Sequence, residues 1–464
     1  MEEAKIRQIY KKQKNYFSSN ITLDVNFRLK QLKKLRNSIK ENEDMLISAL
    51  KKDLNKSETE AYLCDIGPTI FEIDEIINNL KKWAKPEKHF SGIACFPSFR
   101  TNVLKMPYGT CLIISPFNFP VLLSLGVLAA CISAGNTAVL KCSSKSKHTT
   151  KALKKLISTT FKKKYIAVID GGHDVADFLL DMPFDKVFYT GSPKIGKHVL
   201  SKSAKNLTPV ALELGGETGN WCIVRKDANL KDAARKIAFF KACNSGQICI
   251  NINQVVVAQE VAKEFLTELK KAFKKQLGVN PVQNSEYPKL INETAFSKCE
   301  NQVKKYHDKI IYGGNGNNKN CKFAPTVLYP IDINDEIVQQ ELFNPILPVV
   351  PYRDKEIDKV LKIISSRQHG LALYIFTRNK KWARKVMSTM QYGGGCINEV
   401  CVHIMVKGVP FNGVGHSGMG AYHGEWGFRE FSHPSTVLEG KTYFNLSLRE
   451  HPYKNKIKIL KMFM

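Results

Sequence analysis

A cysteine surrounded by small and amide side chains stands near the middle of the chain. It is Cys249, the last residue of the stretch NSGQIC at 244–249. A nucleophilic thiolate must be reachable by its substrate, and a turn of small residues leaves more room around sulfur than a packed apolar stripe does. Because most single cysteines are inert core residues, this stretch by itself leaves both interpretations open.

Two other polar residues stand just after predicted strands. Glu213 ends an apolar run in front of two glycines, and Asn118 stands in SPFNFP. A carboxylate at the carboxyl edge of an open α/β sheet lies where ligands bind, and burial raises its pKa toward the range of a general base. The Asn118 amide can donate a hydrogen bond to a developing oxyanion. A salt bridge at a turn and a turn-forming asparagine are the structural alternatives.

A glycine turn follows another predicted strand. In YTGSPKIG, Gly191, Ser192 and Gly196 come after the apolar run 186–190 and lead into a helical pattern. Such a turn at a helix N-terminus presents free backbone N–H groups to a phosphate. The spacing differs from G-x-G-x-x-G, so an ordinary β–α turn explains the two glycines equally well.

The elements that would position these residues alternate along the chain. The first eighty residues have the apolar period of helices. Apolar runs then predict strands at 111–115, 137–141, 165–169, 186–190 and 209–213. Strands that alternate with helices indicate an α/β fold with a parallel, doubly wound sheet.

A second alternating region predicts a second α/β domain. Strands are expected at 221–225, 254–258, 309–313 and 371–377, and helices at 260–276, 355–367 and 379–390. In the first region no residue between 111 and 140 is charged. Prolines and glycines interrupt that stretch, so we expect a buried strand–helix–strand unit with its helix at 121–134, and no membrane span.

The composition is that of a globular protein with two or three domains. The chain has 464 residues, 43% of them hydrophobic, and a formal net charge of +28. Most lysines fall in helical stretches, so solvated helix faces explain the charge better than a nucleic acid does, and no specific nucleic-acid partner is expected. The twelve cysteines include no C-x-x-C pair, which predicts reduced thiols and no metal site. An N-terminus without an apolar run adds to this, and a cytoplasmic location is expected.

Six motifs carry a resemblance to a known family. SPFNFP, VLK, YTGSPKIG, LELGG, NSGQIC and ELFNPILPV follow one another as they do in the aldehyde dehydrogenase superfamily, which the chain resembles nearly end to end. The stretches at 57–83 and 410–433 resemble the class 3 branch, which includes the fatty and aromatic aldehyde dehydrogenases.

The resemblance implies an architecture of two doubly wound parallel-sheet domains and a small bridging β element. By this resemblance, residues 1–86 and 104–212 form a cofactor-binding domain and residues 213–420 a catalytic domain. Residues 87–103 and 432–446 are expected to form the bridge, which joins two subunits into a homodimer.

The resemblance also implies roles for three residues in the oxidation of an aldehyde. Cys249 attacks the aldehyde to give a thiohemiacetal, whose oxyanion is held by the Asn118 amide and the Cys249 backbone N–H. After hydride transfer to NAD or NADP, Glu213 deprotonates the water that hydrolyses the thioester. The alternatives are a CoA-acylating aldehyde dehydrogenase, which does not need a hydrolytic base, and a non-catalytic protein on the same fold.

The remaining implied residues belong to the cofactor site. The resemblance assigns the pyrophosphate to the glycine turn, the adenosine ribose to Lys141, and the nicotinamide ribose and ring to Glu341 and Phe343. Ser144 stands where many members have a glutamate, and its lack of charge favours acceptance of NADP. Glu217 replaces the lysine that usually follows ELGG. The full cofactor set is Ser115, Phe117, Lys141, Ser144, Gly191, Ser192, Gly196, Glu341 and Phe343.

Overall fold

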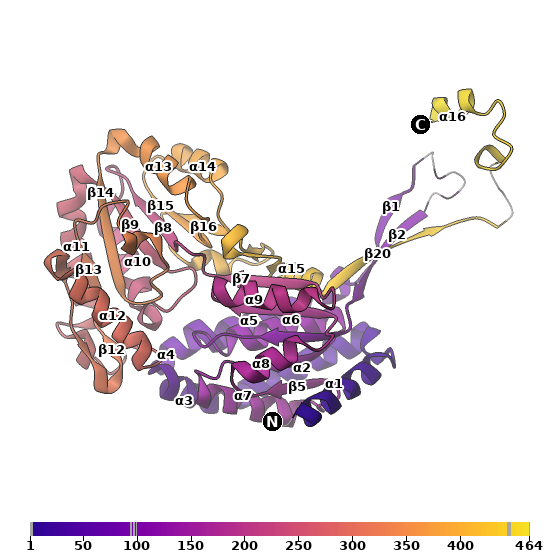
Figure 1. Cartoon of the computed structure of the whole chain (residues 1–464), viewed down its shortest axis with the longest axis horizontal. Coiled ribbons are helices and arrows are strands. Elements are labelled where there is room, and N and C mark those ends of the chain that lie inside the picture. The colour runs from indigo at the N-terminus through magenta and orange to yellow at the C-terminus, as the bar shows by residue number, and fades with distance from the viewer. Residues whose placement is uncertain (1–2, 93–94, 96–97, 99, 443–446, 464) are drawn as a thin grey trace.

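Two open sheets and a projecting arm organise the structure, a computed structural model that describes residues 3–92, 95, 98, 100–442 and 447–463. Figure 1 shows the two helix-covered sheets next to each other and the arm extending away from them. The α/β architecture with parallel sheets that the alternation predicts is confirmed.

Helices make up the N-terminal part of the chain, as the apolar period predicts. The second helix begins after Asp24, whose carboxylate accepts the N–H groups of Asn26 and Phe27, and it buries Leu32, Leu35 and other residues of one face. The helices are α1 (Glu3–Phe17), α2 (Val25–Glu41), α3 (Glu43–Leu54), α4 (Glu58–Ala61) and α5 (Gly67–Trp83), with a π-helical turn, η2, at Tyr62–Ile66.

The first sheet has six strands in the order β18-β7-β6-β3-β4-β5. They are β3 (Thr110–Ile114), β4 (Thr137–Lys141), β5 (Ile166–Ile169), β6 (Lys186–Gly191), β7 (Val210–Leu214) and β18 (Gly418–Met419). All pairs are parallel except β18 with β7. Parallel strands are buried on both faces, which is why continuous apolar runs locate five of them in the sequence.

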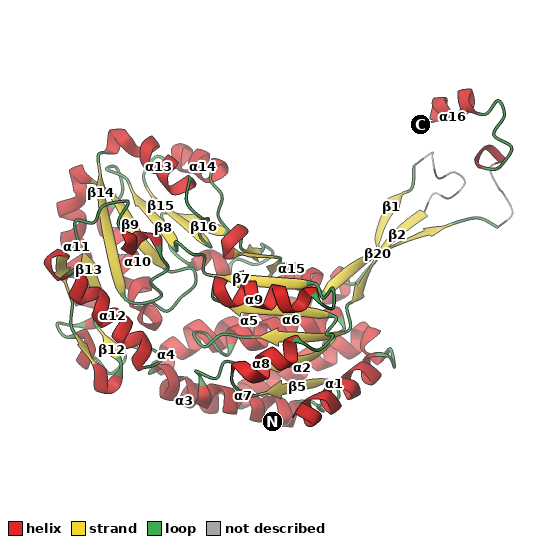
Figure 2. Ribbon diagram, in the orientation of Figure 1, coloured by secondary structure: helices red, strands yellow, loops and turns green. Residues whose placement is uncertain are grey.

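Helices connect the strands of the first sheet. They are α6 (Val127–Ala134), which follows a π-helical turn at Leu122–Gly126, α7 (Lys147–Thr160), α8 (His173–Leu180) and α9 (Pro193–Ala204). Figure 2 shows helices on both faces of this sheet. The helix expected at 121–134 is therefore confirmed. In the described ranges, no helix has both the length and the apolar character needed to cross a bilayer.

The second sheet has seven strands in the order β10-β13-β14-β9-β8-β15-β16. The sequence predicts four of them, β8 (Asn220–Val224), β9 (Ile252–Ala258), β10 (Ile310–Tyr312) and β15 (Ala372–Phe376). It misses β13 (Thr326–Leu328), β14 (Ile346–Tyr352) and β16 (Gly394–Ile397). Strand β14 contains Pro348 and Pro351, which are typical of strand edges, although it lies between two parallel partners.

Five helices belong to the second sheet, and helices expected at 260–276, 355–367 and 379–390 are among them. They are α10 (Leu230–Ala242), α11 (Gln259–Leu277), α12 (Glu293–Lys305), α13 (Ile357–Ser365) and α14 (Lys380–Thr389). The short pairs β11 (Gly316–Asn317) with β12 (Lys322–Phe323) and β17 (Phe411–Asn412) with β19 (Ala421–Tyr422) complete this part of the chain.

The arm is an antiparallel sheet in the order β1-β2-β20. Its strands are β1 (Glu87–Phe90), β2 (Arg100–Pro107) and β20 (Ser432–Glu439). They fall within or next to the expected bridge, of which residues 93–94, 96–97, 99 and 443–446 lie outside the described residues. Helix α15 (Gly424–Glu430) lies just before β20 in the chain, and α16 (Ile457–Phe463) lies after it.

Candidate active site

The loop that carries Cys249 joins α10 to β9 and has an unusual backbone. Asn244, Ser245 and Gly246 have φ values of 48°, 53° and 76°, in the left-handed region. A Cβ atom on Gly246 would lie 2.2 Å from the carbonyl oxygen of Asn344. Glycine is therefore required at the third position of NSG, and this turn directs the following residues toward the first sheet.

Asn118 holds this loop from the other sheet. Its Nδ2 donates to the Gln247 carbonyl at 3.1 Å, and its own carbonyl accepts from Nδ2 of Asn244 at 2.9 Å. Asn118 is buried. One amide hydrogen thus binds the main-chain carbonyl of Gln247, two residues before Cys249, and the amide nitrogen carries a second hydrogen that can bind a substrate oxygen.

The Cys249 thiol lies in a low-dielectric and acidic environment. The side chain is partly exposed, and the Cys249 carbonyl accepts from Nδ2 of Asn220 at 2.7 Å. Burial, together with the nearby carboxyl groups of Glu341 and Glu213, raises the pKa of Cys249 to about 12. The thiol therefore keeps its proton at neutral pH in the protein alone, and a proton acceptor or a neighbouring positive charge is needed to form the thiolate.

Glu213 is a buried carboxyl group near that thiol. It lies on β7, paired in register with Thr190 of β6, and is 3% exposed. Among the described residues, neither of its carboxyl oxygens has a hydrogen-bond partner. Burial, and to a lesser degree the charge of Glu430, raises the pKa of Glu213 well above its ordinary value. An unpaired buried carboxyl of this kind is typical of a proton-transfer group and costly for stability.

Glu341 and Phe343 lie on the segment before β14 and reach the same region. A Cβ atom on Gly215 would lie 1.9 Å from Oε1 of Glu341, so the carboxyl group packs on the glycine backbone two residues after Glu213. Burial raises the pKa of Glu341 to about 8. The rings of Phe117 and Phe343 meet edge to face with centroids 5.9 Å apart. These contacts bring together Phe117, Gly215 and the segment with Glu341 and Phe343, which are three distant parts of the chain.

Three cofactor candidates lie at the ends of β3 and β4. The Ser115 N–H donates to the Lys141 carbonyl at 3.1 Å, so these two residues are neighbours across the sheet. The buried Lys141 donates through Nζ to the Cys142 carbonyl at 3.0 Å. Ser144 is exposed and lines a pocket of about 870 Å³ together with Lys147 and Asp170.

The glycine turn lies at the start of α9. Ser192 is its N-cap residue and is exposed, and Pro193 follows it as the first residue of the helix. A Cβ atom on Gly196 would lie 2.9 Å from Cδ2 of Leu214, and one on Gly191 would lie 2.1 Å from the Tyr189 hydroxyl. The glycines therefore allow α9 to pack closely on β7 and keep the turn open, as a phosphate site requires.

These placements fit a nicotinamide dinucleotide. A helix N-terminus with free N–H groups, a lysine and a serine at strand ends, and a carboxyl that packs on a glycine provide donors and acceptors for a phosphate, a ribose hydroxyl and a second ribose. No group of three or more His, Cys, Asp or Glu side chains in the described part of the chain could hold a metal ion.

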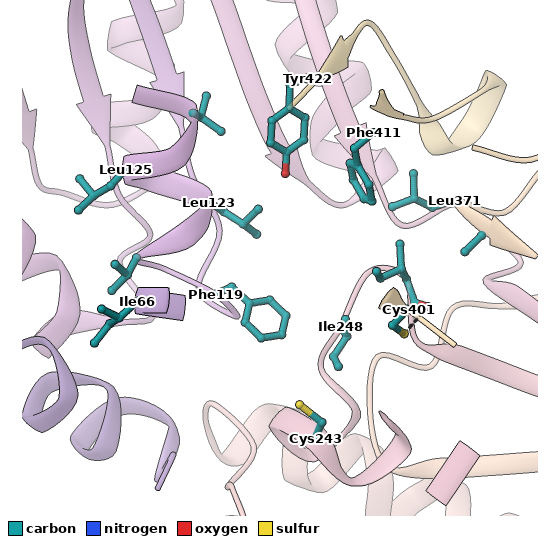
Figure 3. Packing of buried hydrophobic residues seen from close by; sticks show 14 of the residues in the cluster. Ile66, Phe119, Leu123, Leu125, Cys243, Ile248, Leu371, Cys401, Phe411 and Tyr422 are labelled. Carbon is teal, nitrogen blue, oxygen red and sulfur yellow. Dashed lines mark hydrogen bonds between the residues drawn. The ribbon is translucent and has the colours of Figure 1, made fainter. Parts of the chain in front are cut away.

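Buried apolar side chains lie around the Cys249 loop. Figure 3 shows Phe119 and Leu123 on one side and Ile248 and Cys401 on the other. The Tyr422 hydroxyl points toward these side chains. The nearby charges of Glu213 and Cys249 add to burial in raising the Tyr422 pKa.

Sequence reasoning missed a buried ion pair under the site. Lys56 lies just before α4 and Asp65 in η2; both side chains are fully buried, and Lys56 Nζ also donates to the Asn118 carbonyl at 3.0 Å. No local pattern marks Lys56, because lysines of this kind are usually on the surface. In the sequence, Asp65 in the helical run after Lys56 is the feature that indicates an ionic partner.

Glu217, which replaces the usual lysine, makes an ion pair with Lys197 and lies close to the His416 ring. Its carboxylate lies 2.9 Å from Nζ of Lys197 and 3.0 Å from Nδ1 of His416. The hydrogen bond from Lys197 is the largest cause that lowers the pKa of Glu217 to about 2. The Glu217 carbonyl accepts the N–H of Glu341 at 2.9 Å, so this residue helps position Glu341 through its backbone.

Comparisons with known proteins agree with this geometry. The model of the aldehyde dehydrogenase family matches residues 1–437. The chain is 35% identical over 458 residues to 4,4′-diaponeurosporen-aldehyde dehydrogenase of Staphylococcus aureus, covering 99% of each chain. It is 36% identical over 438 residues to the dimeric NADP-preferring aldehyde dehydrogenase of Mus musculus, covering 94% of each.

A solved structure supports the same conclusion. The substrate-bound state of Staphylococcus aureus AldH superposes with a TM-score of 0.95 at 35% identity, covering 99% of each chain. Relatives named as members of aldehyde dehydrogenase family 3 in Arabidopsis thaliana include one that is 34% identical over 449 residues, covering 96% of this chain and 92% of its own. The chain therefore belongs to the aldehyde dehydrogenase family, in its class 3 branch, whose members oxidise aldehydes with NAD or NADP.

Proposed function

We propose that Cys249 is the nucleophile of NAD(P)-dependent aldehyde oxidation in this protein, with Asn118 and Glu213 as its partners. The observation that carries the proposal is the unpaired, buried Glu213 carboxyl near a reachable thiol, on the loop that Asn118 holds. A carboxyl group in that position has no evident structural use, since it forms no described hydrogen bond and its burial is unfavourable.

The residues divide the reaction between them. The Cys249 sulfur adds to the aldehyde carbon, and the oxygen that becomes negative accepts hydrogen bonds from the second Asn118 amide hydrogen and the Cys249 backbone N–H. When bound, the oxidised nicotinamide supplies a hydride acceptor and a positive charge. Glu213 then takes a proton from a water molecule, whose oxygen attacks the thioester carbon; the C–S bond breaks and the carboxylic acid leaves.

The residues of the cofactor site receive the roles that their positions support. Ser192 and the N–H groups of the 191–196 turn bind the pyrophosphate, and Lys141 with Ser115 the adenosine ribose. Glu341 binds the nicotinamide ribose, and Phe343 with Phe117 packs on the ring. Either NAD or NADP serves, because Ser144 has no charge to repel a 2′-phosphate.

We propose an apolar aldehyde as the substrate. Exposed apolar side chains lie on the two segments that meet beside the site, and Gly408 N–H bonds to Glu75 at 3.1 Å where these segments touch. One relative is named for its action on 4,4′-diaponeurosporen-aldehyde, which is therefore included among the aldehydes to be tested. The exposed side chains are Tyr62, Leu63 and Phe71 on η2 and α5, and Val402, Met405 and Val406 on the facing loop.

We propose the domain division that the resemblance implies, with 1–86 and 104–212 binding the cofactor and 213–420 completing the active site. The arm, at 87–103 and 432–446, would join two copies into a homodimer. Strand β20 is an edge strand with exposed Val437 and Leu438, which favours pairing with a partner sheet. The free cysteines of the described chain support a cytoplasmic location.

The proposal is tested by replacing the nucleophile. Cys249→Ala should abolish aldehyde oxidation, followed by the absorbance of the reduced nicotinamide, while the cofactor still binds with nearly unchanged affinity. A panel of aldehydes of rising chain length should give rising kcat/KM if the exposed apolar side chains of η2, α5 and the facing loop contact the substrate. Substantial turnover by Cys249→Ala would contradict the assignment, and a strict requirement for coenzyme A would favour the acylating alternative.

A further inference from the structure

Two cysteines outside the proposed reaction lie in contact beside the active-site loop. The Sγ atoms of Cys64 and Cys243 are 3.6 Å apart, although the residues are 179 positions apart in the chain. Cys64 lies in η2, and Cys243 is the residue at which α10 ends and the Asn244–Gly246 turn begins. A disulfide needs sulfur atoms about 2.05 Å apart, so a closure of roughly 1.5 Å would join them.

The two thiols differ in their surroundings. Cys64 is partly exposed, whereas Cys243 is buried. Figure 3 shows the Cys243 sulfur turned toward the elements that carry Ile66 and Phe119. The hydrogen bond with Cys64, followed by burial, raises the pKa of Cys243 well above its ordinary value. An oxidant in solution therefore reaches Cys64 first, while Cys243 remains a thiol.

The side chain of Glu60 is positioned to accept the proton of Cys243. Its Sγ donates to Oε1 of Glu60 at 3.6 Å, and the same oxygen accepts the Asn244 N–H at 2.6 Å. Burial raises the pKa of Glu60, which makes it a stronger base than an exposed carboxylate. The thiol that must become the attacking sulfur thus has its base in place.

We propose that Cys64 and Cys243 form a reversible disulfide when a hydroperoxide oxidises Cys64. The Cys64 sulfur attacks the peroxide, the O–O bond breaks, the alcohol leaves, and Cys64 becomes a sulfenic acid. Cys243 gives its proton to Glu60 and its sulfur attacks the sulfenic sulfur. The S–S bond forms, the S–O bond breaks, and the hydroxyl leaves as water with the proton that Glu60 returns.

The Cys64–Cys243 disulfide would change the active site through the two segments that it joins. On one side Cys243 is followed by Asn244, whose Nδ2 donates to the carbonyls of Asn118 and Gln247. On the other side Cys64 is followed by Asp65, whose Oδ1 accepts the N–H of Val121 at 3.1 Å. Closure pulls both segments that hold Asn118. Because a displacement of about 1 Å can cost about 10²-fold in rate, we expect oxidation to lower turnover at least tenfold.

The disulfide is tested first in the Cys249→Ala protein, which removes the proposed nucleophile; Cys95 and Cys321, which are also partly exposed, are followed in the same peptide map. After treatment with tert-butyl hydroperoxide, non-reducing peptide mapping should find residues 64 and 243 in one cross-linked peptide, which dithiothreitol separates. Cys111 of β3 and Cys131 of α6, a fully buried neighbouring pair, serve as the internal control and should remain thiols. Oxidation of Cys64 to sulfinic acid with Cys243 still free would overturn the proposal.

The effect on activity is measured in the protein with its nucleophile. Turnover is divided by the amount of free Cys249 thiol, which peptide mapping after iodoacetamide labelling provides. The wild type should lose at least tenfold after peroxide and regain it with dithiothreitol, whereas Cys64→Ser and Cys243→Ser start with ordinary activity and keep it. Equal losses in all three proteins would contradict an effect of the disulfide.

Discussion

Lys56 and Asp65 form an ion pair with Nζ and Oδ2 2.6 Å apart, and both side chains are 0% exposed. The pair lies under the active site, because Lys56 also donates to the Asn118 carbonyl and Asp65 accepts the Val121 N–H. Its ammonium group lies 4.2 Å from the centroid of the Phe119 ring. Two buried charges thus hold the segment 118–122 that carries Asn118, the proposed oxyanion donor.

Removing one charge of this pair should therefore destabilise the protein more than replacing both charges. Lys56→Met leaves a buried carboxylate without its partner, and we expect a loss of about 3–5 kcal/mol in the free energy of unfolding. The Lys56→Met/Asp65→Leu variant should lose less than the sum of the two single changes. Urea unfolding of the four proteins measures this, and strictly additive losses would mean that the two charges do not interact.

Asn118→Ala removes one proposed oxyanion donor. The acylation step should slow by about 10²–10³-fold, equivalent to roughly 3–4 kcal/mol of lost transition-state stabilisation. The backbone contacts of Asn118 with Lys56 and Asn244 remain, so the protein should still fold. Asn118→Asp, which replaces a donor by an acceptor, should be at least as slow. Pre-steady-state hydride transfer is the measurement, and an unchanged rate would leave Asn118 only a structural role.

Glu213→Gln should separate the two halves of the reaction. Hydride transfer can still occur, but the thioester loses its base, so about one equivalent of reduced nicotinamide should appear before turnover slows by about 10²–10⁴-fold. The matched control is Glu217→Gln, which changes a nearby carboxylate that pairs with Lys197 at the surface; this variant should turn over steadily. If the burst disappears together with steady turnover, Glu213 acts in forming the Cys249 thiolate instead.

The same residue should make stability depend on pH. Burial raises the Glu213 pKa in the folded protein above the ordinary value of 4.5, so the folded state binds more protons than the unfolded state between the two values. The free energy of unfolding should therefore fall as pH rises through this window, and the fall should be smaller in Glu213→Gln. Denaturant titrations from about pH 5 to about pH 9 provide the comparison. Parallel curves would mean that the folded-state pKa is close to ordinary.

Cofactor choice should depend on Ser144. A glutamate there would place a negative charge beside the pocket that also contains Lys147, and a 2′-phosphate would be repelled. We expect Ser144→Glu to lower the NADP/NAD ratio of kcat/KM severalfold. Ser388→Glu, an exposed serine on α14, adds the same charge on the other sheet and should leave the ratio unchanged. An unchanged ratio in Ser144→Glu would place Ser144 away from the phosphate.

The sequence alone located the N-terminal helices, five strands of the first sheet and four of the second, and it determined the order of the motifs. Apolar runs located the parallel strands of the first sheet, since strands buried on both faces leave a continuous apolar record. The same reasoning failed at β14, where Pro348 and Pro351 oppose a local strand signal and only packing between β13 and β9 overrides it. The resemblance supplied Cys249, Glu213 and Asn118, which local patterns left ambiguous.

What only the tertiary structure decided is the environment of those residues. Nothing near Glu213 in the chain predicts that both its oxygens lack a hydrogen-bond partner among the residues that the structure describes, because the groups around it come from Glu430, Tyr422 and other distant positions. The contacts of Lys56 with Asn118 and of Cys64 with Cys243 likewise join segments that are distant in the chain. Burial and charge depend on the sum of such long-range contacts, so a local stretch of sequence names a reactive residue without setting its pKa or its partners.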